Sequence, residues 1–197
     1  SKYTTIIIRG QHDGIVKSNR PDSISPLISL MGGIDNNNVI FMKESVFTNL
    51  GQVIFVNYGI FGDLNLNKLK YEISNKRINL SGTKSNNIIV GLYHGIVNGA
   101  KTHLGYEFQD ASYLSASDFD CCDFVMLGDI HKRQDIRPNI SYAGSLMCQN
   151  FGEEPDHGFL VWDLDKGTHE FVKVDNDYTH RTIEISNIDR FDINKHE

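Results

Sequence analysis

Three short segments of the sequence combine glycine with side chains that can bind metal ions. They are Gly10-Gln-His-Asp13, His94-Gly95 and Gly128-Asp-Ile-His131. Imidazole nitrogen, carboxylate oxygen and amide oxygen together suit Mn, Fe or Zn better than Ca. Each segment follows a β-branched or apolar run, so the three loops can meet at one edge of a sheet. We therefore predict a site for one or two transition-metal ions.

The elements that must position these loops are short buried strands. Apolar, β-branched runs predict strands over residues 3–9, 39–42, 52–58, 87–93, 123–127, 140–143, 158–164 and 169–174, with a further strand or a lead-in at 181–185. Asp165-Lys166-Gly167 predicts a hairpin turn between the two strands that flank it.

Helices are fewer in this sequence. Ser25 as N-cap and Pro26 as first helical residue predict a helix through Met31 that Gly32-Gly33 would stop. Residues 115–122 predict one or two helical turns, and residues 62–87 an irregular connection. The fold class expected is α/β: an incomplete sandwich of mixed β-sheets flanked by helices, with the site at the carboxyl ends of strands.

Composition limits the partners and the compartment. The 197 residues carry a formal net charge of -6, so a polyanion would have to be held by metal or by a local patch. The apolar runs are far shorter than the ~20 residues that cross a bilayer, so no membrane segment is expected. The start of the chain lacks the pattern of a secretory signal, and three cysteines are no disulfide framework. These features favour an intracellular location, in cytoplasm or nucleus.

The ordered motifs resemble those of calcineurin-like metallophosphoesterases. Gly10-Gln-His-Asp13 is similar to their Gly-Asn-His-Asp/Glu motif, His94 to their isolated histidine, and Gly128-Asp-Ile-His131 to their Gly-His-x-His. Residues 140–153, followed by 157–163, are similar to the Pro-Gly-Ser-Leu…Asn-Phe-Gly-Glu…Gly-Phe segment of SbcD-type DNA repair nucleases. The variant with aspartate in the Gly-His-x-His motif most resembles those of phages and large DNA viruses. The resemblance covers roughly residues 3 to 185.

The resemblance implies a two-metal site. It makes Gln11, His94 and Asp129 ligands of one metal and His131 a ligand of the other. The implied cofactor is Mn²⁺, with Mg²⁺, Fe²⁺ or Zn²⁺ as alternatives.

The resemblance also implies roles for residues that are not ligands. His12 would stabilise or protonate the leaving oxygen of the scissile phosphodiester. Lys132 and Arg133 are candidate phosphate contacts, although a solvated basic loop is an equal interpretation.

The sequence departs from the family pattern in two ways. Gln11 stands where the family has asparagine, and Asp129 where most members have histidine. The family's Asp-x-His and Gly-Asp-x-x-Asp/His motifs have no counterpart ahead of Gly10, and Gly62-Asp63 lies in the wrong order. We therefore expect residues 1–178 to be the carboxyl-terminal part of a phosphoesterase domain, and residues 179–197 a lead-in to a capping domain or a tail.

The functional hypothesis is a hydrolase: part of a Mn-dependent DNA repair exonuclease, impaired as an isolated chain. Its implied partners are DNA, an SbcC-type ATPase, and either a second copy or a complementing amino-terminal half. One alternative is a non-catalytic form that binds DNA or a partner. Another is a phosphomonoesterase or cyclic-nucleotide phosphodiesterase.

Several residues favour structural interpretations. Asp13 is expected to cap a turn. Ser145 lacks a nucleophile motif. Cys121 and Cys122 are expected to end a helix as small buried residues. The histidines without a partner pattern are expected at the surface; they are His157, His169, His180 and His196.

Overall fold

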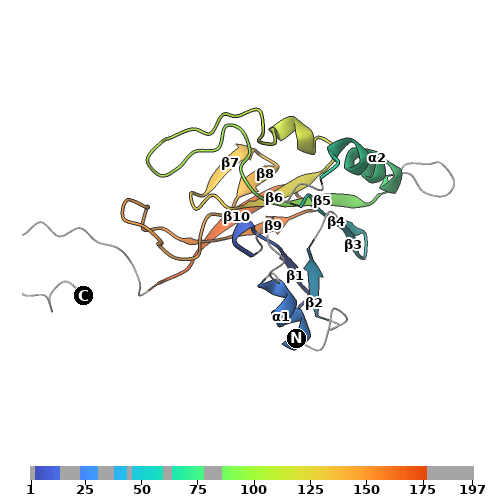
Figure 1. Cartoon of the computed structure of the whole chain (residues 1–197), viewed down its shortest axis with the longest axis horizontal. Helices are drawn as coiled ribbons and strands as arrows, with labels where there is room; N and C mark the ends of the chain where they lie inside the picture. Colours follow the sequence, from blue (N-terminus) through green and yellow to red (C-terminus); the bar gives the residue numbers. More distant parts are fainter. Residues whose placement is uncertain are drawn as a thin grey trace, which may run out of the picture.

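A mixed sheet of six strands forms the centre of the molecule (Figure 1). The computed structural model describes residues 3–13, 23–30, 38–43, 46–59, 64–77 and 86–176. In spatial order the strands are β3 (Phe47–Leu50), β4 (Val53–Asn57), β5 (Ile88–His94), β6 (Phe124–Gly128), β8 (Ile140–Tyr142) and β7 (Gln134–Arg137). The inner strands β4, β5, β6 and β8 run parallel, and each edge strand is antiparallel to its neighbour. The inner strands therefore direct their carboxyl ends to one edge of the sheet.

Two strand pairs cover one face of this sheet. β1 (Thr5–Ile8) is parallel to β2 (Val39–Met42), and β9 (Gly158–Asp163) is antiparallel to β10 (Thr168–Lys173). A core cluster of Met42, Val90, Leu92 and Phe124 lies between the layers, with side chains of β1, β2 and β9 packed against it. Burying β1 against the sheet brings the loop after β1 close to the carboxyl end of β5.

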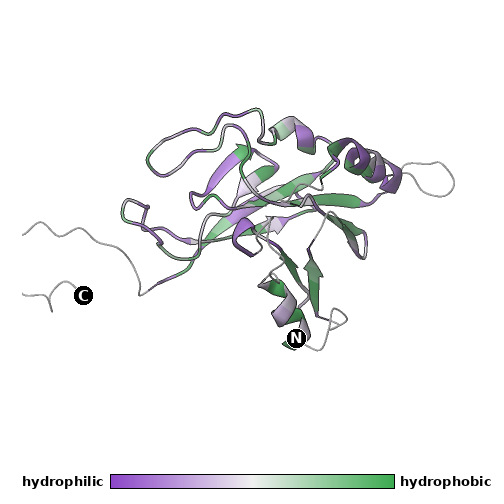
Figure 2. Ribbon diagram, in the orientation of Figure 1, coloured by the Kyte–Doolittle hydropathy of each residue, from purple (hydrophilic) through white to green (hydrophobic). Residues whose placement is uncertain are grey.

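Helical elements cover the opposite face. Helix α2 (Leu66–Lys76) buries Leu69 and Ile73 in the larger core cluster, and its first turn is capped by Asn65. The short 3-10 helix η2 (Ala116–Phe119) adds Phe119 to the same cluster. Figure 1 shows α2 on the side of the sheet away from β1, β2 and helix α1 (Ile24–Leu30). Figure 2 shows hydrophobic residues along β1, β2 and β5, as expected of buried strands.

The α/β class is confirmed: the chain has a mixed sheet, smaller strand pairs and two α-helices among the residues described. All strands predicted in the described ranges are present, and the Asp165-Lys166-Gly167 turn joins β9 to β10. The strand predicted at 181–185, the Gly32-Gly33 helix stop and the 179–197 segment lie outside the described residues. Within those residues, no helix has the length and apolarity needed to cross a bilayer.

Three predictions of local structure were wrong. Residues 62–87 include helix α2, because Leu66, Leu69 and Ile73 place one apolar stripe at helical spacing. Ser25 lies inside α1 rather than capping it, since the helix begins at Ile24. The edge strands β3 and β7 were not predicted.

Candidate metal centre

His94 ends β5 and is held between two glycines of the other motifs. A Cβ atom added at Gly10 would lie 2.9 Å from His94 Nε2, and one at Gly128 would lie 2.8 Å from its Nδ1. Both distances are shorter than real Cβ contacts permit, so the imidazole occupies space that any other residue would fill. Gly10 and Gly128 therefore have a physical reason to be glycines: a larger side chain at either position would overlap the ring of His94.

Asp129 and Gln11 lie beside this imidazole. Asp129 follows β6, whose last residue Gly128 is paired in register with His94, and its Oδ1 lies 3.9 Å from His94 Nε2. Gln11, in the 3-10 helix η1 (Gln11–Asp13), donates from Nε2 to the same Oδ1 of Asp129. Loops after β1, β5 and β6 thus bring an imidazole, a carboxylate and an amide together.

Asp129 has a backbone conformation that L-residues rarely adopt. Its φ is 93°, and it is the sole non-glycine residue with positive φ in the described part of the chain. Such strain costs on the order of 1–3 kcal/mol and persists where surrounding structure enforces it. Here the β6 register and the contacts with Gln11 and His94 enforce it, which fixes the direction of the carboxylate.

The electrostatics of His94 favour a neutral ring. Burial lowers the pKa of His94, and this effect outweighs the nearby carboxylates of Asp129 and Asp13, which raise it. The charges of His12 and His131 also act on the ring and lower its pKa. A neutral imidazole offers a lone pair, so His94 can bind a metal ion near neutral pH.

Asp13 stabilises the loop that carries Gln11 and His12. It accepts a hydrogen bond from the Gly10 backbone N–H at 2.8 Å and another from the Ser23 hydroxyl at 2.6 Å. The capping role predicted for Asp13 is therefore confirmed. His12 itself is exposed in η1.

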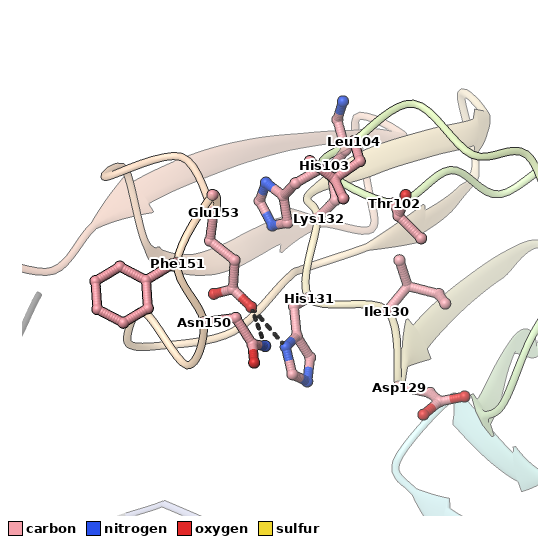
Figure 3. Close-up of a pocket in the computed structure, with 11 residues that line it drawn as sticks. Thr102, His103, Leu104, Asp129, Ile130, His131, Lys132, Asn150, Phe151 and Glu153 are labelled. Carbon is pink, nitrogen blue, oxygen red and sulfur yellow. Dashed lines mark hydrogen bonds and ion pairs between the residues drawn. The ribbon is translucent and has the colours of Figure 1, made fainter. Parts of the chain in front are cut away.

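His131 is bound by a residue of the segment that follows β8. Its Nδ1 lies 3.0 Å from Glu153 Oε1, and the Asn150 side-chain amide donates to the same oxygen at 3.0 Å. Figure 3 shows the Glu153 carboxylate reaching both groups, while Asp129 lies apart at the end of its strand. Burial raises the pKa of Glu153, but hydrogen bonds from the Gln149 backbone, Asn150 and His131 outweigh it and lower the pKa to about 2. Glu153 is therefore a charged carboxylate at neutral pH, and hydrogen bonds hold it in place.

The two basic candidates occupy different surroundings. Lys132 lines a pocket of about 340 Å³ together with Asp129, His131 and Glu153, and its Nζ lies 3.9 Å from Glu154. The Arg133 guanidinium instead lies over the Phe171 ring, 4.1 Å from its centre. Of the two, Lys132 lines the pocket beside His131.

The prediction that the remaining histidines are surface residues was wrong for two of them. His157 is 5% exposed and bonded to Ser145, and His169 stacks on Trp162 with its Nε2 3.1 Å from Asp135. These contacts join residues that are distant in the sequence or on paired strands, so sequence spacing does not indicate them. His180 and His196 lie outside the described residues.

Glu153, the last residue of the Asn-Phe-Gly-Glu motif, is a site residue to which the sequence analysis assigns no role. Its place three residues after Asn150, whose amide it accepts, is the signal that could have identified it as a fixed carboxylate.

Comparisons with known proteins give one informative match. The chain is 34% identical over 186 residues, 91% of its length, to an uncharacterized protein of Acanthamoeba polyphaga mimivirus. It spans 13% of the length of that viral protein. No protein-family profile matches the chain. The similarity relates the chain to a giant-virus protein and assigns no activity.

Proposed function

We propose that this chain carries part of the site of a metal-dependent phosphodiesterase acting on DNA, as the carboxyl-terminal part of the phosphoesterase domain of an SbcD-type nuclease. The observation that carries the proposal is the arrangement of His94 between Gly10 and Gly128, beside Asp129 and Gln11. Motifs about 85 and 35 residues apart meet at one sheet edge, which is how rigid scaffolds build catalytic sites.

The donor set fits Mn²⁺. His94 supplies a neutral imidazole and Asp129 a carboxylate fixed by its backbone, both ligands suited to this ion. Gln11 directs its amide nitrogen to Asp129, so a half-turn of the amide is needed before its carbonyl oxygen can act as a ligand. Bound metal would neutralise the charge of the phosphodiester, which the net charge of -6 otherwise repels.

Two side chains act directly on the substrate in this proposal. His12, exposed in the loop after β1, donates a proton to the leaving oxygen. Lys132 contacts a phosphate from the pocket beside His131. By the family resemblance, the partners are an SbcC-type ATPase and a second copy or a complementing amino-terminal half, in an intracellular compartment.

The test is Mn²⁺-dependent cleavage of duplex DNA by the chain mixed with a segment that carries the Asp-x-His and Gly-Asp-x-x-Asp/His motifs. We expect cleavage to be lost in His94→Ala, kept in His169→Gln, and raised by Gln11→Asn. His169 is the matched control because it stacks on Trp162, outside the proposed site. No cleavage even with Gln11→Asn would refute the proposal. Faster hydrolysis of p-nitrophenyl phosphate esters than of DNA would instead favour a phosphomonoesterase or cyclic-nucleotide phosphodiesterase.

One observation favours a second candidate, a non-catalytic module that binds DNA. The Gln11 amide occupies an oxygen of Asp129 that a metal would need. In that case the chain should bind duplex DNA equally well with Mn²⁺ and with a chelator, and Gln11→Asn should leave this affinity unchanged. A gel-shift titration under both conditions separates the two candidates.

A further inference from the structure

We propose that Cys148, Glu153 and His157 form a separate zinc site in the segment that follows β8. One ligand atom from each residue lies within 4.8 Å of the other two. All three side chains are buried or nearly so: Cys148 is 9% exposed, His157 5%, and the Glu153 side chain 5%. This cluster is distinct from the His94 centre, and zinc binding there does not require nuclease activity.

His157 is oriented as a metal ligand would be. Its Nδ1 lies 3.1 Å from the Ser145 carbonyl oxygen and 3.0 Å from the Ser145 hydroxyl. An Nδ1–H that donates to the carbonyl leaves the lone pair on Nε2. Histidines bound to metal usually donate their other ring N–H to a neighbouring oxygen in this way. The Nε2 atom is buried and has no hydrogen-bond partner, an arrangement that costs free energy unless a ligand satisfies it.

The distances suit a small ion. His157 Nε2 lies 3.9 Å from Glu153 Oε2. Zinc bonds of about 2.0–2.2 Å at a tetrahedral angle put two such ligand atoms roughly 3.4 Å apart, so the pair must close by about 0.5 Å. Both residues belong to one loop-borne segment, which can make so small an adjustment.

The chemistry of the donors selects zinc. A thiolate, an imidazole and a carboxylate form a mixed S, N, O set, in which the soft thiolate disfavours Mg²⁺, Ca²⁺ and Mn²⁺. Binding releases the thiol proton of Cys148 to solvent, and two negative ligands then neutralise the ion. Three protein ligands leave the fourth tetrahedral position to water.

A metal here would also fix the position of His131. The same Glu153 that offers Oε2 to the cluster contacts His131 Nδ1 through Oε1. Bound zinc would therefore also join the two ends of the loop between β8 and β9 and hold Glu153 in place.

The experiment measures Zn²⁺ affinity and stoichiometry on the full chain, in the unmodified protein and in a His94→Ala background. That background removes the imidazole of the His94 centre, so zinc binding at the Cys148 cluster can be measured whether or not the proposed nuclease function holds. Cys148→Ser is the test variant, and Cys121→Ser is the matched control at another free cysteine. We expect one zinc per chain in the His94→Ala background, weakened about 100-fold or more by Cys148→Ser and unchanged by Cys121→Ser.

X-ray absorption at the zinc edge provides a second measurement that needs no change at Cys148. We expect one sulfur neighbour at about 2.3 Å and nitrogen or oxygen neighbours at about 2.0–2.2 Å. Equal zinc affinity in folded Cys148→Ser would overturn the proposal. So would a zinc spectrum without a sulfur neighbour, and this second result decides the matter where Cys148→Ser does not fold.

Discussion

Replacing Gly128 with alanine tests whether the glycines of the motifs exist to admit His94. The new Cβ would lie 2.8 Å from His94 Nδ1, and its three nearest atoms all belong to the His94 ring. The backbone at Gly128 is not in the left-handed region, so alanine brings no conformational strain of its own. The ring cannot move freely away either, because Gly10 lies against the Nε2 side of the ring.

The geometry sets the size of the effect. Reaching the ordinary contact distance of 3.4 Å requires the ring to move by about 0.6 Å, and functional constellations tolerate only ~0.5 Å. Overpacking of this kind costs about 1–3 kcal/mol of the free energy of unfolding. We also expect Mn²⁺ affinity to fall about tenfold or more, because the ligand is displaced.

A second background reverses the sign of the stability change. With His94→Ala already present, the space beside Gly128 is open, and Gly128→Ala should then stabilise the protein by about 0.4–1 kcal/mol by restricting the unfolded chain. Urea denaturation of the four proteins in the presence of a chelator measures this double-mutant cycle. If Gly128→Ala has the same effect in both backgrounds, the explanation that Gly128 makes room for the His94 ring is refuted.

Three further predictions concern the surroundings of the site. Tyr142 donates to the Gly95 carbonyl at 2.7 Å and accepts from the Val97 N–H at 2.9 Å, so Tyr142→Phe should lower the free energy of unfolding by about 1–3 kcal/mol in chemical denaturation. Burial raises the pKa of Asp118, but hydrogen bonds from Ser115 and Lys70 outweigh it and hold that pKa below its ordinary value. The resulting stability is present above the unfolded pKa and lost as pH falls, so Asp118→Asn should cost about 1 kcal/mol at pH 7 and progressively less below about pH 4. Hydrogen bonds from Cys122 and Tyr58 outweigh burial and lower the pKa of Cys121, which is also more exposed than Cys122 and Cys148. Peptide mapping after iodoacetamide treatment at pH 7 should therefore find Cys121 modified first. Equal labelling of the three cysteines in the folded chain would contradict that last expectation.

The central strands could be predicted because continuous apolar runs are typical of strands that are buried on both faces. β5 reads Ile-Ile-Val-Gly-Leu-Tyr-His and β6 reads Phe-Val-Met-Leu-Gly, and both are covered on two faces. The edge strands lack this signal. β7 reads Gln-Asp-Ile-Arg, polar enough to resemble a loop, and its pairing with β8 is visible only in three dimensions.

Helix α2 was not predicted because its amino-acid composition is typical of a loop, although its apolar residues have helical spacing. Its Asn, Lys and Ser residues are typical of loops, yet Asn65 caps it and Leu69 and Ile73 face the core. In a segment of this kind, a few apolar residues at helical spacing carry more information than the polar majority, because tertiary packing supplies most of the stability of a helix.

Part of the site could likewise be predicted from the sequence, and part could not. The place of the three segments after strands predicted that their loops meet at one sheet edge, and the structure places Gln11 and His94 beside Asp129. The burial of His157 and the stacking of Arg133 on Phe171 could not be predicted, because both depend on how the β9–β10 pair folds back over the sheet.

One segment controls two histidines by the same device. Glu153 lies within hydrogen-bond distance of Nδ1 of His131, and the Ser145 carbonyl oxygen lies within that distance of Nδ1 of His157. A neutral ring that donates from Nδ1 carries its lone pair on Nε2. An imidazole that is free to change tautomer would offer its lone pair from Nε2 only part of the time, whereas a ring anchored at Nδ1 offers it continuously. The segment from Ser145 to His157 therefore holds both rings at Nδ1, and each of the two proposed metal sites would use the Nε2 atom that this leaves available.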